Sequence, residues 1–159
     1  MKITIVCVGK IKEKYLVEAI GEYSKRLSRY CDLDIIEVSD EKTSDKASDH
    51  EENLIREKEA ERINKHIPDG AHVIATAIGG KEYSSVEFSE KIEKLGVDGV
   101  SHIVFLIGGS IGLDMGLLQD ADERISFSRM TFPHQLMRVI LLEQIYRAYR
   151  IMKGEPYHK

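Results

Sequence analysis

Two loop sequences in this chain contain residue types that suit a ligand packed against bare backbone. The first, GGSIG at residues 108–112, follows the apolar run IVFLI at 103–107. Glycines let the backbone turn through positive φ and let a ligand approach the main chain closely. The second, SRMTFPH at 128–134, follows a short strand-like run at 124–127. If both runs are parallel strands, their loops meet at one edge of a sheet, where open α/β sheets bind ligands.

The glycine loop at 108–112 matches neither of the common phosphate-binding motifs. No Lys-Ser or Lys-Thr pair follows its last glycine, so it is not a P-loop. Its glycine spacing also differs from GxGxxG, and it follows a late strand instead of the first one. From Gly108 and Gly109 alone, a plain strand-to-helix turn without a ligand is an equally good interpretation.

The C-terminal residues form a second group whose types are suited to chemistry. The sequence ends in GEPYHK at 154–159. Tyr157 offers a ring that can stack on a splayed base. His158 offers an imidazole that can accept a proton near neutral pH, and Lys159 offers a charge that can meet phosphate. The alternative is a frayed end without function, which is the usual fate of terminal residues.

Strand-like and helix-like segments alternate along the chain, which predicts an α/β fold with a mostly parallel sheet covered by helices on both faces. The expected strands are residues 2–8, 33–38, 71–78, 101–107 and 124–127, and the expected helices are 13–30, 49–66, 84–95 and 136–152. We interpret the charged helix at 49–66 as a solvated face and not as a site. A length of 159 residues suits a single domain, 1–159.

Composition narrows the class of protein further. The chain is 42% hydrophobic and 31% charged, as is typical of soluble globular proteins. No apolar run approaches the roughly 20 residues of a membrane span, and Lys10, Lys12 and Lys14 interrupt any signal peptide. The cysteines, Cys7 and Cys31, form no CxxC pair and suggest no zinc site, and Cys7 is expected to be a buried, reduced thiol. We therefore expect a cytoplasmic protein with no membrane partner.

Charge is distributed unevenly along the chain. The net charge of −4 argues against non-specific binding of nucleic acid by the whole surface. However, residues 1–30 contain seven Lys or Arg and three Asp or Glu, and residues 129–159 contain six and two. If the two ends meet in the fold, they form a basic face that suits RNA. On charge alone, an ordinary scatter of surface charge is the slightly favoured alternative.

Three segments of the chain resemble one known family. They are MKITIVCVGKIKEKY at the start, IGGSIGLD around the glycine loop, and FSRMTFPHQLMR with the following LLEQIYRAYRIMKGEPYHK. These segments are similar to the ribosomal RNA large subunit methyltransferase H family of minimal SPOUT-class methyltransferases, and the resemblance covers essentially all 159 residues. It implies a C-terminal trefoil knot, which the hydrophobic pattern does not reveal and which is very rare among folds.

The resemblance also implies an activity and a cofactor site. Members of the family transfer a methyl group from S-adenosylmethionine to N3 of a pseudouridine in the helix 69 loop of 23S ribosomal RNA, in the assembled ribosome. Carried over by position, the cofactor contacts are Thr76, Gly108, Phe127, Ser128, Arg129, Met130, Thr131 and Phe132. A threonine stands at 76 where many relatives have leucine, so we expect a backbone contact there. No metal is expected, because the sulfonium donor is already activated.

Methylation of N3 requires that its proton be removed, and the tail offers two candidates. His158 is the first candidate for the base and Tyr157 the second. The expected RNA contacts are His134, Arg138 and Lys159, although a mere first-turn helix residue is an equally good interpretation of His134. The alternative functions are a ribosome-associated RNA-binding module without catalysis, and a small-molecule enzyme that binds NAD or FMN.

The last expected helix, at 136–152, is apolar around most of its circumference. Such a helix must be buried on several sides, and in a small domain the second cover would be another subunit, in line with the homodimer that the resemblance implies. A helix from His134 to Met152 is about 28 Å long. Its C-terminal tail therefore cannot easily reach a cofactor at its own start, and we expect a site shared between antiparallel subunits.

Overall fold

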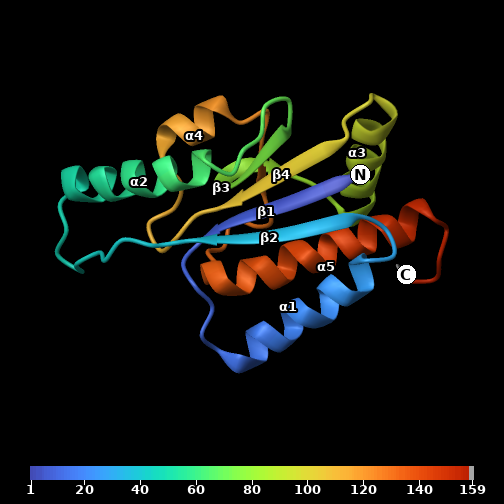
Figure 1. The fold of residues 1–159 in the computed structure, drawn as a ribbon, viewed down its shortest axis with the longest axis horizontal. Helices are drawn as coiled ribbons and strands as arrows, with labels where there is room; N and C mark the ends of the chain where they lie inside the picture. Colours follow the sequence, from blue (N-terminus) through green and yellow to red (C-terminus); the bar gives the residue numbers. More distant parts are fainter. Residues whose placement is uncertain (158–159) are drawn as a thin grey trace.

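The computed structural model describes residues 1–157 and contains one sheet flanked by five helices (Figure 1). The strands are β1 (Lys2–Val8), β2 (Asp32–Val38), β3 (His72–Glu82), β4 (His102–Ile107) and β5 (Glu123–Ser126). The helices are α1 (Lys14–Leu27), α2 (Asp49–Asn64), α3 (Ser85–Val97), α4 (Met115–Asp120) and α5 (His134–Met152). None of these helices is long and apolar enough to cross a membrane.

The strands are arranged in the order β2-β1-β4-β3-β5, and every pair of neighbours is parallel. The predicted parallel α/β sheet is thus confirmed. Because all strands run the same way, the loops that follow β1, β3, β4 and β5 lie at the same edge of the sheet. This carboxyl edge is where parallel sheets bind ligands.

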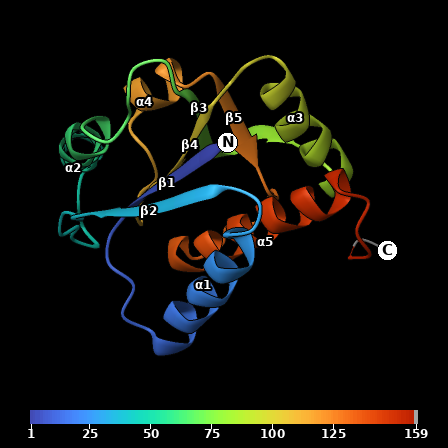
Figure 2. The ribbon, with the colours of Figure 1, turned by 45° about the vertical axis from the view of Figure 1, so that its right-hand side comes forward.

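The sheet is buried on both faces, which explains why its central strands are continuous apolar runs. Along β1, Ile3, Ile5 and Cys7 pack in a cluster with α1, α3 and α5, whereas Val6 and Val8 pack with α2 and α4. Figure 2 shows these two groups of helices on opposite sides of the sheet. Burial raises the pKa of the Cys7 thiol to about 12, so this side chain stays protonated and acts as a small apolar residue.

Helix α5 packs against the sheet between α1 and α3 (Figure 1). Leu141, Leu142, Ile145 and Ala148 are fully buried within this single protomer. Much of the apolar circumference that the sequence analysis assigned to a second subunit is therefore covered by the chain's own helices and sheet. A substitution at Ile145 would disrupt the core of the protomer and would not test a dimer.

Two features of the structure were not expected from the sequence. Helix α4 is only six residues long, too short to show a helical period; Asp114 caps it by accepting a hydrogen bond from the Gly116 N–H at 2.8 Å. Strand β3 continues to Glu82 beyond the predicted end at Ile78, after an interruption in its pairing with β5.

Candidate functional site

A cavity of about 820 Å³ lies at the carboxyl edge of the sheet, between the loops that follow β3, β4 and β5 and the first turn of α5. Seven of the eight residues expected to contact the cofactor line this cavity: Thr76, Gly108, Phe127, Ser128, Met130, Thr131 and Phe132. The eighth, Arg129, is exposed on the same loop but does not line the cavity. The fold thus brings together residues from three separate parts of the chain.

The glycine loop forms one wall of the cavity through its backbone. A β-bridge joins Gly109 to Gly112, and the Gly112 N–H donates to the Gly109 carbonyl at 3.1 Å. Gly112 has a φ of +83°, which favours glycine. A Cβ atom on Gly108 would lie 2.6 Å from the Gly112 carbonyl carbon. The loop's own packing therefore requires glycine at 108, and Gly108→Val would distort the loop whether or not a ligand binds there.

The interruption in β3 forms a second wall. The Thr76 hydroxyl donates to the Leu106 carbonyl at 2.9 Å, so this side chain links β3 to β4, which leaves its backbone as the part suited to a ligand. Beyond Thr76 the strand turns away, and Ile78 is 72% exposed toward the cavity. The strand resumes after Gly80, where a Cβ atom would lie 2.6 Å from the backbone of Ile125 in β5. Only glycine lets β3 return this close to β5.

The loop after β5 forms the third wall and is fixed by two serines. The Ser126 hydroxyl donates to the Ser128 carbonyl at 2.9 Å, and the Ser128 hydroxyl accepts a hydrogen bond from the Met130 N–H at 3.0 Å. The side chain of Met130 is 74% exposed beside the cavity. It makes an adaptable apolar surface that a flat ligand can cover.

His134 lines the cavity and lies in the first turn of α5. Its Cε1 atom is 3.6 Å from the position that a Cβ atom on Gly9 would take, so the loop after β1 packs against this lining residue. Burial, and then the charge of Arg138, lower the pKa of His134, against the opposite effects of Asp40 and Glu13. Since its usual pKa is near 6.5, His134 presents a neutral imidazole at neutral pH.

Arg138 is inside the protein, with an exposed fraction of 1%. Its Nη1 donates to Glu37 Oε2 at 2.7 Å, and its Nη2 donates to the carbonyls of Val8 at 3.0 Å and Gly9 at 2.6 Å. The expected contact with RNA is therefore not supported by the position of this side chain. Arg138 instead joins the carboxyl ends of β1 and β2 to α5.

Tyr157, the second candidate for the base, is docked on the C-terminal half of α5. Its ring lies edge-on to Tyr146 with 5.0 Å between centroids, and the guanidinium of Arg147 is 4.6 Å from its centroid. Its hydroxyl is 3.3 Å from Glu143 Oε1. Burial, and then the Glu143 charge, raise the pKa of Tyr157. Within one protomer, Tyr157 thus packs against the middle of α5, whereas the first turn of this helix lines the cavity. His158 and Lys159 lie outside the described residues.

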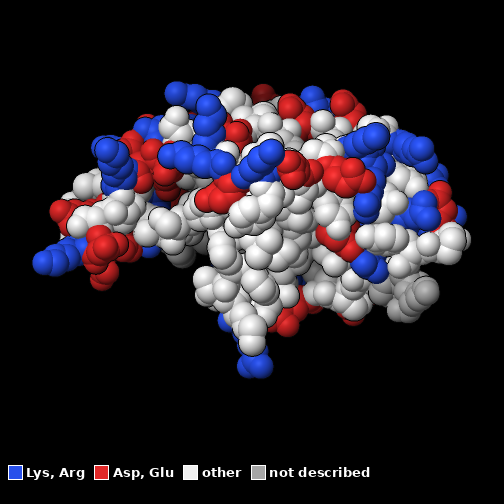
Figure 3. Space-filling view, turned by 90° about the horizontal axis from the view of Figure 1, so that it is seen from below, with Lys and Arg blue, Asp and Glu red and all other residues white. Residues whose placement is uncertain are grey.

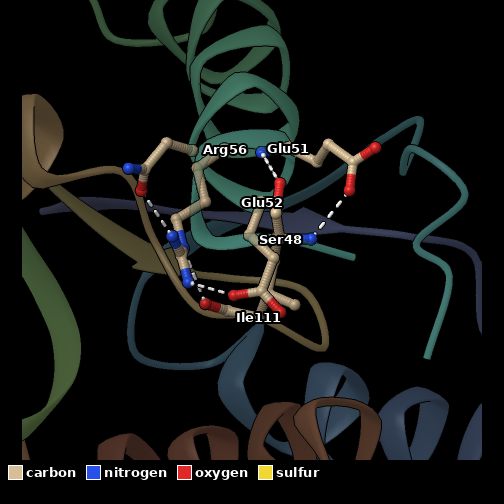
Figure 4. A network of polar contacts seen from close by, with 6 residues as sticks. Ser48, Glu51, Glu52, Arg56 and Ile111 are labelled. Carbon is tan, nitrogen blue, oxygen red and sulfur yellow. Dashed lines mark hydrogen bonds and ion pairs between the residues drawn. The ribbon is translucent and has the colours of Figure 1, made fainter. Parts of the chain in front are cut away.

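Helix α2 holds the glycine loop through a side-chain hydrogen bond. The sequence did not predict this role, because the charged helix was interpreted as a solvated face. Arg56 donates through Nε to the Ile111 carbonyl at 2.9 Å, and its other nitrogens donate to Asn53 and Glu52 of the same helix (Figure 4). A capping box of Ser48 and Glu51 fixes the start of α2. The recoverable signal was the (i, i+4) spacing of Glu52 and Arg56, which favours a fixed guanidinium.

A parallel α/β sheet with a loop-lined cavity at its carboxyl edge defines a ligand-binding α/β protein. Comparison with known families identifies which ligand-binding α/β proteins this chain is related to. The family model described as "Predicted SPOUT methyltransferase" matches residues 1–158, and the chain belongs to this family of methyltransferases. The α/β fold expected from the resemblance agrees with the structure, and the trefoil knot stays a prediction.

Relatives of known name match the chain over its full length. It is 64% identical over 159 residues to "Ribosomal RNA large subunit methyltransferase H" of Bifidobacterium adolescentis. It is 58% and 60% identical to proteins of that same name from Clostridium kluyveri and Clostridium perfringens, and each alignment covers 100% of both chains. Among solved structures, a probable methylase family protein from Haemophilus influenzae shares the fold, with a TM-score of 0.53 and 16% identity over 99% of this chain and 70% of that one.

Proposed function

We propose that this protein transfers a methyl group from S-adenosylmethionine to N3 of a pseudouridine in the helix 69 loop of 23S ribosomal RNA, within the assembled ribosome. Large-subunit ribosomal RNA as the substrate is supported by the names of full-length relatives at 58–64% identity. The observation that carries the proposal is the cavity formed by the loops after β3, β4 and β5, at the position where the family resemblance expects the cofactor. Action on ribosomes implies that the protein is located in the cytoplasm.

The cavity suits S-adenosylmethionine in size and in chemistry. Its volume of about 820 Å³ lies within the usual range for small-molecule sites. Ile78 and Met130 offer apolar surface for an adenine ring, and the backbone of the glycine loop offers polar groups for its edge. When bound, the cofactor supplies a methyl group that is already activated, so the protein has to position the acceptor and remove its proton.

The N3 proton needs an acceptor, and we keep His158 as the first candidate. It would accept this proton as the N3–methyl bond forms and the sulfur–methyl bond breaks, which leaves neutral S-adenosylhomocysteine. Tyr157 is less suited to this role while docked, because its raised pKa and the contact with Glu143 both oppose the phenolate form. We propose that the docked Tyr157 holds the tail and that Lys159 contacts phosphate.

We also propose a homodimer in which the tail of one subunit completes the cavity of the other. Within one protomer, the docked Tyr157 contacts Glu143, which lies nine residues, or about 14 Å, along α5 from His134 at the cavity. Figure 3 shows a broad area without charged residues in the middle of the face where α1 and α5 lie. Depletion of charged residues is typical of the core of a protein interface.

The decisive experiment uses purified protein, S-adenosylmethionine labelled in its methyl group, and ribosomes from a strain that lacks the modification. We expect one label per ribosome, at N3 of the helix 69 pseudouridine, and none on ribosomes that are already modified. Label at another nucleotide would overturn the proposed site. Ribosome binding without label or cofactor binding would favour the RNA-binding module, and calorimetric binding of NAD or FMN would favour the small-molecule enzyme.

A further inference from the structure

The loop that connects β1 to α1 presents a group of lysines that the proposed function has not yet used. Lys10 and Lys12 lie in this loop, Lys14 opens α1, and all three are exposed. Lys14 is 3.8 Å from Glu18 in a pair whose side chains are both mostly exposed, and such pairs contribute little. Within residues 1–157, no ion pair joins Lys10 or Lys12 to an acidic side chain. The ammonium groups are available to an outside partner.

The lysine loop is held rigidly from beneath by buried groups. The buried guanidinium of Arg138 binds the Gly9 carbonyl at 2.6 Å, just before Lys10. Glu37 Oε2, which accepts from Arg138, also accepts from the Ile11 N–H at 3.0 Å, just after Lys10. The backbone is therefore fixed on both sides of Lys10. A preorganised loop loses less conformational freedom when a partner binds.

The lysine loop also lies beside a residue that lines the cavity. Gly9 lies against His134, which is part of the cavity lining, although residues 9–14 themselves are not. Figures 1 and 2 both show the β1–α1 connection running past the first turn of α5. Three acidic groups lie nearby: Glu13 in the loop, Asp40 beside Gly9, and Glu37, which is paired with Arg138. Even so, residues 10–14 contain three lysines and one glutamate, so the segment is basic.

We propose that Lys10 and Lys12 form a phosphate-binding rim that docks the RNA backbone beside the target nucleotide, with Arg138 and Glu37 as its positioning residues. This inference rests on the proposed function, because it takes RNA as the substrate. An enzyme that acts on one base must hold the neighbouring backbone, and phosphate contacts fix register without reading sequence. A protein partner is a poorer fit, since lysine is depleted in protein–protein interfaces.

The test compares two double variants with lysines at opposite edges of the same sheet. Lys10→Ala/Lys12→Ala removes the rim, and Lys2→Ala/Lys94→Ala removes two exposed lysines from the amino edge. Ribosome binding is measured from about 50 to 200 mM KCl, and KM for ribosomes is measured at saturating S-adenosylmethionine. For the rim variant we expect a KM about tenfold higher, a salt slope smaller by about 1 to 2, and kcat and cofactor affinity within about twofold of wild type. The control variant should match the wild type.

Three results for the lysine variants would contradict the proposed rim. An unchanged KM and salt slope in Lys10→Ala/Lys12→Ala would overturn the proposal, as would a loss confined to kcat. Equal losses in both double variants would show a general charge effect and also overturn it. If the wild type binds ribosomes but labels no RNA, the proposed function fails, while the binding isotherms still decide whether the rim docks RNA.

The positioning role of Glu37 is tested separately, because removal of the buried Arg138 would put the fold itself at risk. Glu37→Ala removes the acceptor shared by Ile11 and Arg138, whereas Glu37→Gln retains a carbonyl oxygen. We expect Glu37→Ala to raise the ribosome KM at least about threefold with unchanged cofactor affinity, and Glu37→Gln to restore most of the loss. A folded Glu37→Ala protein with a wild-type ribosome KM would remove Glu37 and Arg138 from the proposal.

Discussion

Met130 provides the most direct test of the cavity at the scale of one residue, because the fold does not depend on its exposed side chain. Covering this side chain with a cofactor should contribute about 1 kcal/mol. We therefore expect Met130→Ala to weaken S-adenosylmethionine binding about fivefold in calorimetry, with unchanged thermal stability. Met115→Ala is the matched control, since Met115 is also exposed but does not line the cavity. Equal cofactor affinities in Met130→Ala and Met115→Ala would indicate that the cofactor binds outside this cavity.

His134 makes a prediction about pH. Burial and the charge of Arg138 lower the pKa of His134 in the folded protein. Near pH 6.5, His134 therefore binds a proton in the unfolded chain but remains neutral in the folded protein. The contribution of His134 to the free energy of unfolding is therefore fully present above pH 6.5 and is lost as the pH falls toward the folded pKa. We expect urea unfolding between about pH 5 and 7.5 to show a smaller decline for His134→Gln than for wild type.

The pH dependence should not vanish in His134→Gln, because burial also lowers the pKa of His102 in the same direction. A matched comparison with His50→Gln, on the exposed start of α2, separates the effect of burial from that of losing any histidine. Identical pH profiles for wild type and His134→Gln would show that His134 is protonated equally in the folded and unfolded states.

Some residue roles could be predicted from the sequence and others could not. Glycines and small polar residues after strands identify a place where backbone is exposed to a ligand, and the expected cofactor residues do line one cavity apart from Arg129. Arg138 could not be predicted, because an arginine in a helix is normally taken to be exposed. Only the packing of α5 against the ends of β1 and β2 reveals that three carbonyl or carboxylate groups surround it.

At the scale of elements, α2 and the glycine loop are coupled through Arg56. Replacing Arg56 by alanine removes the donor to the Ile111 carbonyl and frees the loop that forms one cavity wall. We expect Arg56→Ala to weaken S-adenosylmethionine binding several-fold, by about 1 kcal/mol, because a single such hydrogen bond contributes about that amount. Arg56→Lys, which retains one charged donor, should recover part of the loss.

Arg62→Ala serves as the control for Arg56→Ala, because the bonds of Arg62 are to Ser39 and Glu41 and not to the glycine loop. Both variants should lower the melting temperature slightly, but only Arg56→Ala should change the calorimetric affinity for the cofactor. If Arg56→Ala and Arg62→Ala bind the cofactor with equal affinity, α2 packs on the sheet without supporting the cofactor site.

The elements themselves were largely predictable, and the exceptions have physical causes. The buried central strands are long apolar runs, so β1 and β4 were located almost to the residue. Helix α4 has too few residues to show a period, and its N-cap Asp114 was the available signal. The end of β3 was missed because Gly79 and Gly80 are typical of a turn, whereas here they let the strand leave the sheet and return beside Ile125.

At the scale of the whole molecule, the proposed dimer is tested on the exposed part of α5. Leu136 is exposed at the start of this helix, whereas Ile145 belongs to the protomer's own core. We expect the wild type to sediment as a dimer at micromolar concentration and Leu136→Asp to shift it toward folded monomer. Leu54→Asp, at an exposed position of α2 on the opposite face of the sheet, should remain dimeric. A monomeric wild type would contradict the proposal.

The shared site makes a further prediction for mixed dimers. Deletion of residues 157–159 should leave cofactor binding near wild type but remove methyl transfer. Ile78→Arg should remove cofactor binding without disturbing the fold, because this exposed residue lines the cavity. Mixing the two inactive proteins should restore one working site per heterodimer, with the cavity of the truncated chain and the tail of the other. Heterodimers without activity at saturating cofactor would show that each site uses its own tail.

The position of β5 has a consequence for how the molecule holds together. This strand has only four residues, lies at the end of the sheet, and pairs with β3 alone. The loop that follows it forms one wall of the cavity, so a ligand in the cavity spans from this outermost strand to the glycine loop after β4. Because a ligand stabilises only the state that binds it, a hundredfold excess over its dissociation constant adds about 2.7 kcal/mol against any opening of this edge. Bound S-adenosylmethionine would then stabilise the pairing of β5 with β3. In a cell short of S-adenosylmethionine, the enzyme would lose this stabilisation of its edge strand as well as its activity.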